Sequence, residues 1–195
     1  RTLIERCLQL LGEGASLDVG YSKAGRLLAR GTVAAPIRFV SAGRKEPGFW
    51  KSIALYDHSD GSVLDNVRIE HAGAGNKPAL SVYGDDIRIT RVKVVATLGA
   101  AIEQRDFDKA RIAELAGNDF TEAGPTEALL ALNVNSLGAL GLDNRFPAGA
   151  VIKISGRVER DLEARMGGQH GGHDLGRPAA GVQRLEARRV GDAAV

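Results

Sequence analysis

Two short acidic segments carry the residues that could do acid–base chemistry. Asp57 and His58 are adjacent in one segment, and Asp85 and Asp86 are adjacent in the other. Carboxylates and an imidazole can transfer protons, and paired carboxylates can bind calcium or flank a glycosidic bond. Arg88 lies close in sequence, but strand alternation does not decide on which face of the sheet its side chain lies. A complete set of catalytic residues is missing. If the chain is an enzyme, these four residues are its catalytic candidates; otherwise they are ordinary turn residues.

A second group of residues is suited to binding rather than to catalysis. Trp50, Tyr56 and Tyr83 lie near Asp57 and His71, in sequence or in repeat phase. A sugar ring has an apolar face and a polar rim, so aromatic side chains beside polar groups suit it. Trp50, Tyr56, His71 and Tyr83 are therefore the ligand-binding candidates, with core packing as the alternative role of Trp50.

Other chemistries lack their motifs in this sequence. The segment 73–77 does not have the spacing of a phosphate-binding loop, and no serine stands in a Gly-x-Ser-x-Gly elbow. The single cysteine, Cys7, excludes an internal disulfide. His170 and His173 are two ligands where a stable zinc site needs three or four. We expect no metal and no cofactor, with calcium only if the chain is an enzyme.

Composition narrows the class of protein further. The 195 residues predict one domain, and 44% hydrophobic with 26% charged residues is an ordinary globular balance. The net charge of +2 argues against a nucleic-acid partner or an anionic membrane surface. No apolar run reaches the roughly 18 to 20 residues that a membrane-spanning helix needs. The composition leaves the oligomeric state open.

Short runs of alternating apolar and polar residues predict the elements that position these side chains. The clearest runs are 37–40, 67–69, 87–89 and 151–154. Each places apolar side chains on one face, which is typical of a half-buried strand. Because turn residues, and not helical stretches, separate the runs, the pattern disfavours a doubly wound α/β fold.

An internal repeat is the strongest signal. Three copies, 64–69, 89–94 and 115–120, follow one another at offsets of 25 and 26 residues, and a second run aligns Ala79, Ala101 and Ala128. Two short strands per period of this length predict one coil of a β-solenoid, with an antiparallel sandwich as the alternative. In a solenoid, Leu64, Ile89 and Leu115 should stack inside, as should Val67 and Val92.

Corner residues fit the same picture. Glycine and asparagine suit the left-handed corners where the chain passes from one sheet to the next. Asn66 and Asn118 occupy neighbouring positions of the repeat, so an asparagine ladder is a hypothesis at this stage.

Three segments in succession, 31–39, 47–53 and 62–73, carry a family resemblance. Their order resembles right-handed parallel β-helix proteins of the pectin-lyase-like superfamily, of the bacterial surface or secreted kind, over about residues 3 to 160. The resemblance implies an extracellular or cell-surface location. Asp57-His58 is similar to a stretch of pectate lyases, and Asp85-Asp86 to the paired aspartates of polygalacturonases, but the partner motifs of both are absent.

The resulting prediction is an all-β, right-handed parallel β-helix over residues 1–161. Residues 3–11 form either its first coil or a short amphipathic helical cap. Residues 162–195 are predicted as a disordered tail, with a short helix near 182–189 as an option. The expected function is a non-enzymatic extracellular binding or scaffold module whose candidate ligand is a polysaccharide or cell-surface glycan. The alternatives are a polysaccharide lyase or glycoside hydrolase of the same superfamily, and a purely structural solenoid segment.

Overall fold

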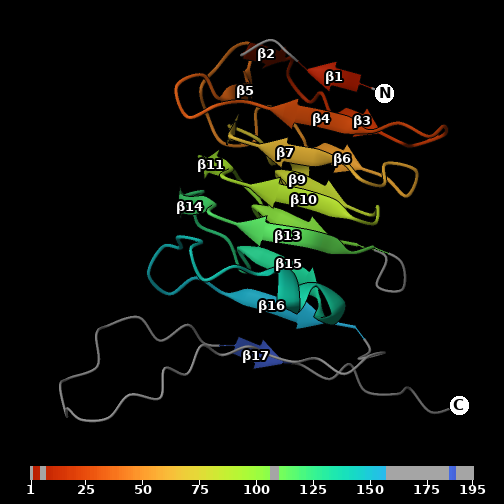
Figure 1. The fold of residues 1–195 in the computed structure, drawn as a ribbon. Helices are drawn as coiled ribbons and strands as arrows, with labels where there is room; N and C mark the ends of the chain where they lie inside the picture. Colours follow the sequence, from red (N-terminus) through yellow and green to blue (C-terminus); the bar gives the residue numbers. More distant parts are fainter. Residues whose placement is uncertain (1, 5–7, 106–109, 157–184, 188–195) are drawn as a thin grey trace, which may run out of the picture.

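The computed structural model describes residues 2–4, 8–105, 110–156 and 185–187, which form three sheets of short parallel strands (Figure 1). Sheet A contains β1 (Thr2–Ile4), β4 (Leu27–Arg30), β7 (Val63–Asp65), β10 (Ile87–Thr90) and β13 (Ile112–Ala116). Sheet B contains β2 (Leu8–Leu11), β5 (Ile37–Ser41), β8 (Val67–Glu70), β11 (Lys93–Val95) and β14 (Asp119–Glu122). Sheet C contains β3 (Leu17–Val19), β6 (Ile53–Leu55), β9 (Leu80–Val82), β12 (Ile102–Gln104), β15 (Leu130–Asn133), β16 (Ile152–Ser155) and β17 (Leu185–Ala187). Two short 3-10 helices, η1 (Ala74–Asn76) and η2 (Val134–Ala139), complete the described secondary structure.

Three consecutive strands, one from each sheet, form what we call a tier. β1, β2 and β3 form tier 1, and each later triplet up to β13, β14 and β15 adds one strand to every sheet. All strand pairs are parallel, and they join neighbouring tiers. The prediction of an all-β chain is confirmed, and the stacking of the tiers is compatible with a β-solenoid.

The predicted internal stack of apolar residues is present. Leu64 pairs with Ile89, and Ile89 pairs with Leu115, in register across β7, β10 and β13. Val67 and Val92 each lie directly before paired positions of β8 and β11. All five side chains are at most 1% exposed. The offsets of 25 and 26 residues therefore identified these core positions correctly, because burial in the space between the sheets favours apolar side chains.

The second predicted alignment is wrong by one residue at its last member. Ala79 and Ala101 lie in register before β9 and β12, but the residue that continues their line is Leu129, not Ala128. The register shift of β14 against β11 raises the offset from 26 to 27 residues, and the loop before β15 raises it to 28, from Ile102 to its partner Leu130. A loop of different length changes the spacing in a way that an equal repeat cannot anticipate.

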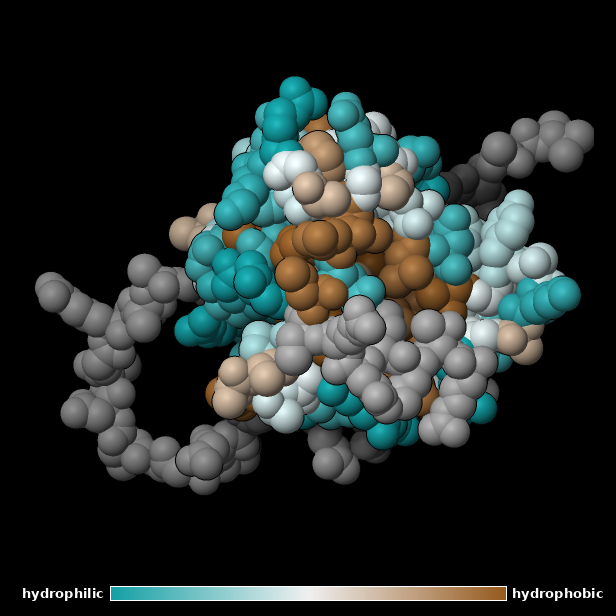
Figure 2. Space-filling model, turned by 90° about the horizontal axis from the view of Figure 1, so that it is seen from above, coloured by the Kyte–Doolittle hydropathy of each residue, from teal (hydrophilic) through white to brown (hydrophobic). Residues whose placement is uncertain are grey.

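The end of the molecule that carries β1 is apolar at its centre and polar around it (Figure 2). The helical cap predicted for residues 3–11 is wrong, since β1 and β2 are strands that pair with β4 and β5. Pairing with the next tier satisfies their backbone groups, which outweighs a weak helical periodicity. Leu8 and Leu10 face outward from β2, with 49% and 62% of their surface exposed.

The corner between sheets A and B uses a left-handed residue in each of three tiers. Asn66, Arg91 and Gly117 have φ angles of 49°, 52° and 66°. Asparagine and glycine adopt this conformation readily, as the sequence predicts, whereas an arginine is strained there.

An asparagine ladder begins one residue further on. Asn118 is fully buried: its Nδ2 donates to Ile89 O at 3.0 Å and to Asn144 Oδ1 at 2.8 Å, and its Oδ1 accepts from Val92 N at 2.8 Å. Asn144 Nδ2 donates to Leu115 O at 2.7 Å. The ladder therefore consists of Asn118 and Asn144 and ties three levels of the chain together.

Most of the predicted tail lies outside the described residues, and so does the predicted boundary at residue 161. β17 pairs in parallel with β16, so a strand occupies the place where the sequence allowed a short helix. Among the described residues, no helix is long and apolar enough to cross a membrane.

Candidate functional site

Three tyrosines from three successive tiers lie in one row, which we call the tyrosine column: Tyr21, Tyr56 and Tyr83. Tyr56 and Tyr83 directly follow β6 and β9, where their backbone N–H groups donate to Val19 O and Leu55 O at 2.9 and 2.8 Å. The rings of Tyr56 and Tyr83 are stacked, with centroids 5.1 Å apart and planes 11° apart. The rings of Tyr21 and Tyr56 lie 4.8 Å apart at 70°. Regular spacing of the tiers thus turns three distant residues into one aromatic surface.

The column combines ring surface with a nearby carboxylate. Tyr21 is 71% exposed, so its ring is open to solvent. Burial raises the pKa of the Tyr56 hydroxyl, and the negative charge of Asp18 raises it further. The Tyr56 hydroxyl therefore stays protonated and can donate a hydrogen bond throughout the physiological range.

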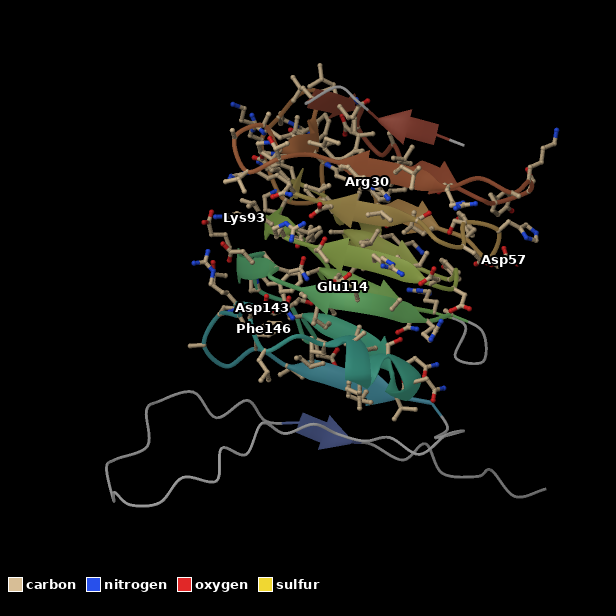
Figure 3. All side chains as sticks on the ribbon, viewed as in Figure 1. Arg30, Asp57, Lys93, Glu114, Asp143 and Phe146 are labelled. Atoms are coloured by element: carbon tan, nitrogen blue, oxygen red, sulfur yellow. The ribbon has the colours of Figure 1, made fainter. Side chains whose placement is uncertain are left out.

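A cleft of about 700 Å³, the sheet A cleft, is lined in part by the turn that follows Tyr56. Its polar lining includes Arg26, Arg30, Asp57, His58 and Asp60. Figure 3 shows Arg30 on the front of β4 and Asp57 in the loop at the edge of the same sheet. The two predicted catalytic candidates of this segment, Asp57 and His58, thus share one cleft with two arginines.

The other predicted pair, Asp85 and Asp86, is not part of the cleft lining. Asp85 lies one tier further along, where its N–H donates to Asp60 Oδ1 at 2.8 Å and its Oδ1 accepts from Arg111 Nε at 3.1 Å. Asp86 has a left-handed backbone and lies 3.6 Å from Arg88 Nη2. These contacts hold the corner together, and the pair belongs to the neighbouring tier, as the repeat phase predicts.

Trp50 and His71 are brought together, but at the opposite corner, between sheets B and C, and below the surface. Trp50 is 0% exposed and its Nε1 donates to Glu70 O at 2.7 Å. His71 Nδ1 lies 3.3 Å from Ser41 Oγ, and burial lowers the pKa of its imidazole. Trp50 therefore has the core-packing role given above as its alternative, and His71 lies beside it, apart from Tyr56 and Tyr83.

The outer face of sheet B pairs its own charges. Arg38 Nη2 and Arg68 Nε both donate to Glu70 Oε1 at 2.8 Å. Further along the same face, Arg145 Nη2 donates to Asp119 Oδ2 at 2.5 Å. Burial alone would raise the pKa of Glu70, but hydrogen bonds and charge from the two arginines lower it. These carboxylates stabilise the sheet, and Figure 3 shows Lys93 on this side, away from Asp57.

Four residues of the site are not among those predicted from the sequence: Asp18, Tyr21, Arg26 and Arg30. Tyr21 stands 35 residues before Tyr56, whereas Tyr56 stands 27 before Tyr83, so the repeat offset does not find it. The signal that could have found it is local, because each tyrosine follows closely on the end of a strand of sheet C. Arg26 and Arg30 flank Leu28 at the two-residue spacing that puts side chains on one face of a strand.

The described residues bring together no group of three or more His, Cys, Asp or Glu side chains that could hold a metal ion. Comparisons with known protein families, with curated proteins and with solved structures find no match to this chain.

Proposed function

We propose that the chain is a non-enzymatic binding module whose tyrosine column takes a glycan. The observation that carries the proposal is the row of Tyr21, Tyr56 and Tyr83, with Asp18 beside it. A pyranose ring can lie on the open ring of Tyr21, while the hydroxyls of the other two tyrosines bind its polar rim. Because the row runs from tier to tier, an extended oligosaccharide would follow the stacking direction of the tiers.

The wider architecture supports a fold proposal of the same kind. One strand per sheet in every tier, joined by parallel pairing, is what a right-handed parallel β-helix of the pectin-lyase-like superfamily would have. The sequence resemblance adds an extracellular or bacterial cell-surface location to the proposal.

Direct binding measurements test the glycan proposal. The purified chain is applied to a glycan array with and without calcium, and hits are titrated by calorimetry. Tyr21→Ala should weaken binding by at least about twofold, since its exposed ring can be removed without disturbing the core. Leu142→Ala is the matched control, because Leu142 is also highly exposed, at 90%, and belongs to none of the site residues. Equal binding by both variants would contradict the proposal.

The sheet A cleft favours a second candidate function, a polysaccharide lyase or glycoside hydrolase. Asp57, His58 and Asp60 line it together with Arg26 and Arg30, which supplies acids, a base and cations in one place. The test is release of unsaturated products or reducing sugars from pectate, alginate and glycosaminoglycans with calcium present. We expect no turnover. Turnover that Asp57→Asn abolishes would make the enzyme the better assignment.

A further inference from the structure

The tyrosine column contains a stacked pair of rings and a tilted pair, Tyr21 and Tyr56, which we call the tyrosine corner. Tyr56 and Tyr83 are nearly parallel, so each covers part of the other's ring face. Tyr21 instead stands at 70° to Tyr56, and 71% of its surface is exposed. The negative π-face of the Tyr21 ring is therefore available to a group larger than water.

The charge beside this corner is negative. Asp18 lies in β3, in register with Ala54, two residues before Tyr56. Burial is the main cause that raises the pKa of the Tyr56 hydroxyl, and the negative charge of the nearby Asp18 carboxylate raises it further. The corner thus joins an open aromatic face to a carboxylate.

Two arginines close to the column in the fold have other partners or places. Arg105 follows β12 at the position that Tyr83 has after β9, and its Nη2 donates to Glu103 Oε2 at 2.8 Å. Arg26 lines the sheet A cleft. Asp18 Oδ2 accepts a hydrogen bond from Ser16 Oγ at 3.0 Å, and the carboxylate has further lone pairs that can accept from a cationic ligand.

We propose that Tyr21, Tyr56 and Asp18 bind the protonated amine of an amino sugar, so that the glycan taken by the column is cationic. A cation over a tyrosine face is attracted by the ring quadrupole, and the carboxylate adds a direct Coulomb attraction. The inference rests on the proposed glycan binding for the identity of the ligand, but the cation site itself can be tested without a sugar.

The experiment uses probes that differ in whether the amine is charged or acetylated, or in the presence of a sugar. Glucosamine oligosaccharides, their N-acetylated counterparts of equal length and tetramethylammonium chloride are titrated at constant ionic strength and slightly acidic pH. We expect the amine oligosaccharide to bind several-fold more tightly than its acetylated counterpart, and tetramethylammonium to shift the tyrosine ring resonances in a saturable way.

The outcomes separate the two proposals. If the acetylated oligosaccharide binds as tightly as the amine, glycan binding stands and the cation site is wrong. If only tetramethylammonium binds, the glycan proposal is wrong and the cation site stands. If none of the probes binds, both are wrong.

Variants locate the site. Asp18→Asn and Tyr21→Ala should each weaken binding of the amine oligosaccharide about two- to fivefold, the range of one cation–π contact at an exposed site. Asp143→Asn makes the same charge change at the opposite edge of sheet A from Asp57, as Figure 3 shows, and should leave binding unchanged. Equal weakening by Asp143→Asn would mean that net charge, and not this corner, attracts the ligand.

Discussion

Replacing Asn118 by valine tests the asparagine ladder most directly. Valine occupies the equivalent position of the two preceding tiers, at Val67 and Val92, so the shape is tolerated there. The substitution removes three hydrogen bonds and leaves Val92 N–H and Ile89 C=O buried without their side-chain partner. The orphaned Val92 N–H costs about 2 kcal/mol and the lost bonds to Ile89 O and Asn144 Oδ1 about 1 kcal/mol each, because the Ile89 carbonyl keeps its place in the β10–β13 pairing; burying valine returns about 2 kcal/mol. We expect a net loss of about 2 kcal/mol.

The assay is equilibrium urea unfolding followed by far-ultraviolet circular dichroism. Fluorescence of the single tryptophan, Trp50, reports on tier 2 in the same samples. Because Asn118 and Asn144 share a bond, the double variant with valine at both positions should cost less than the sum of the two single variants. A loss below about 1 kcal/mol for Asn118→Val, or strict additivity, would refute the view that the ladder satisfies these buried groups.

Three further predictions concern the core, the acid response and a strained corner. Ile89→Asp should lower the free energy of unfolding by several kcal/mol, because Ile89 is 0% exposed. Arg88→Ala, on the outer face of the same strand, should lower it little. Similar losses for both variants in urea unfolding would contradict the register. Burial raises the pKa of Asp119, but hydrogen bonds from Thr121 and Arg145 lower it from 3.8 to about 2. The ionised Asp119 therefore contributes about 2 kcal/mol of stability, which is fully present above the pKa of the unfolded state and is lost as the pH falls from about 4 to 2. Asp119→Asn should flatten this dependence of stability on pH. Arg91→Asn should raise the melting temperature slightly, since asparagine relieves the left-handed strain and the exposed ion pair that is lost contributes little; a clear fall would show that the pair matters more.

Much of the core could be predicted from the sequence because most inward positions favour apolar residues. Leu64, Ile89 and Leu115 recur at offsets of 25 and 26, and the interior of stacked sheets excludes polar side chains at these places. Ala128 shows where this reasoning ends, since the loop before β15 adds a residue to the spacing that holds at Val95 and Glu122.

The site was harder to predict because it depends on loops between strands, whose length is not constrained by the core. Tyr56 and Tyr83 were among the candidates, but Tyr21 was hidden because the loop between β4 and β5 is longer than its counterpart between β7 and β8. Trp50 shows the opposite case: its residue type suits a ligand, but its indole N–H finds a buried carbonyl, which makes the core the favourable place.

Pairing of each tier with only its neighbours has a mechanical consequence. A force applied to the first strand breaks the contacts of one tier before it reaches the next, so the chain should lengthen in discrete steps. In-register residues of neighbouring tiers are 25 residues apart from Leu64 to Ile89 and 36 apart from Leu17 to Ile53. At about 3.3–3.6 Å for each extended residue, the steps should measure about 80 to 130 Å in a single-molecule trace. Such a chain dissipates a pull tier by tier, and the tiers still stacked keep their part of the tyrosine column.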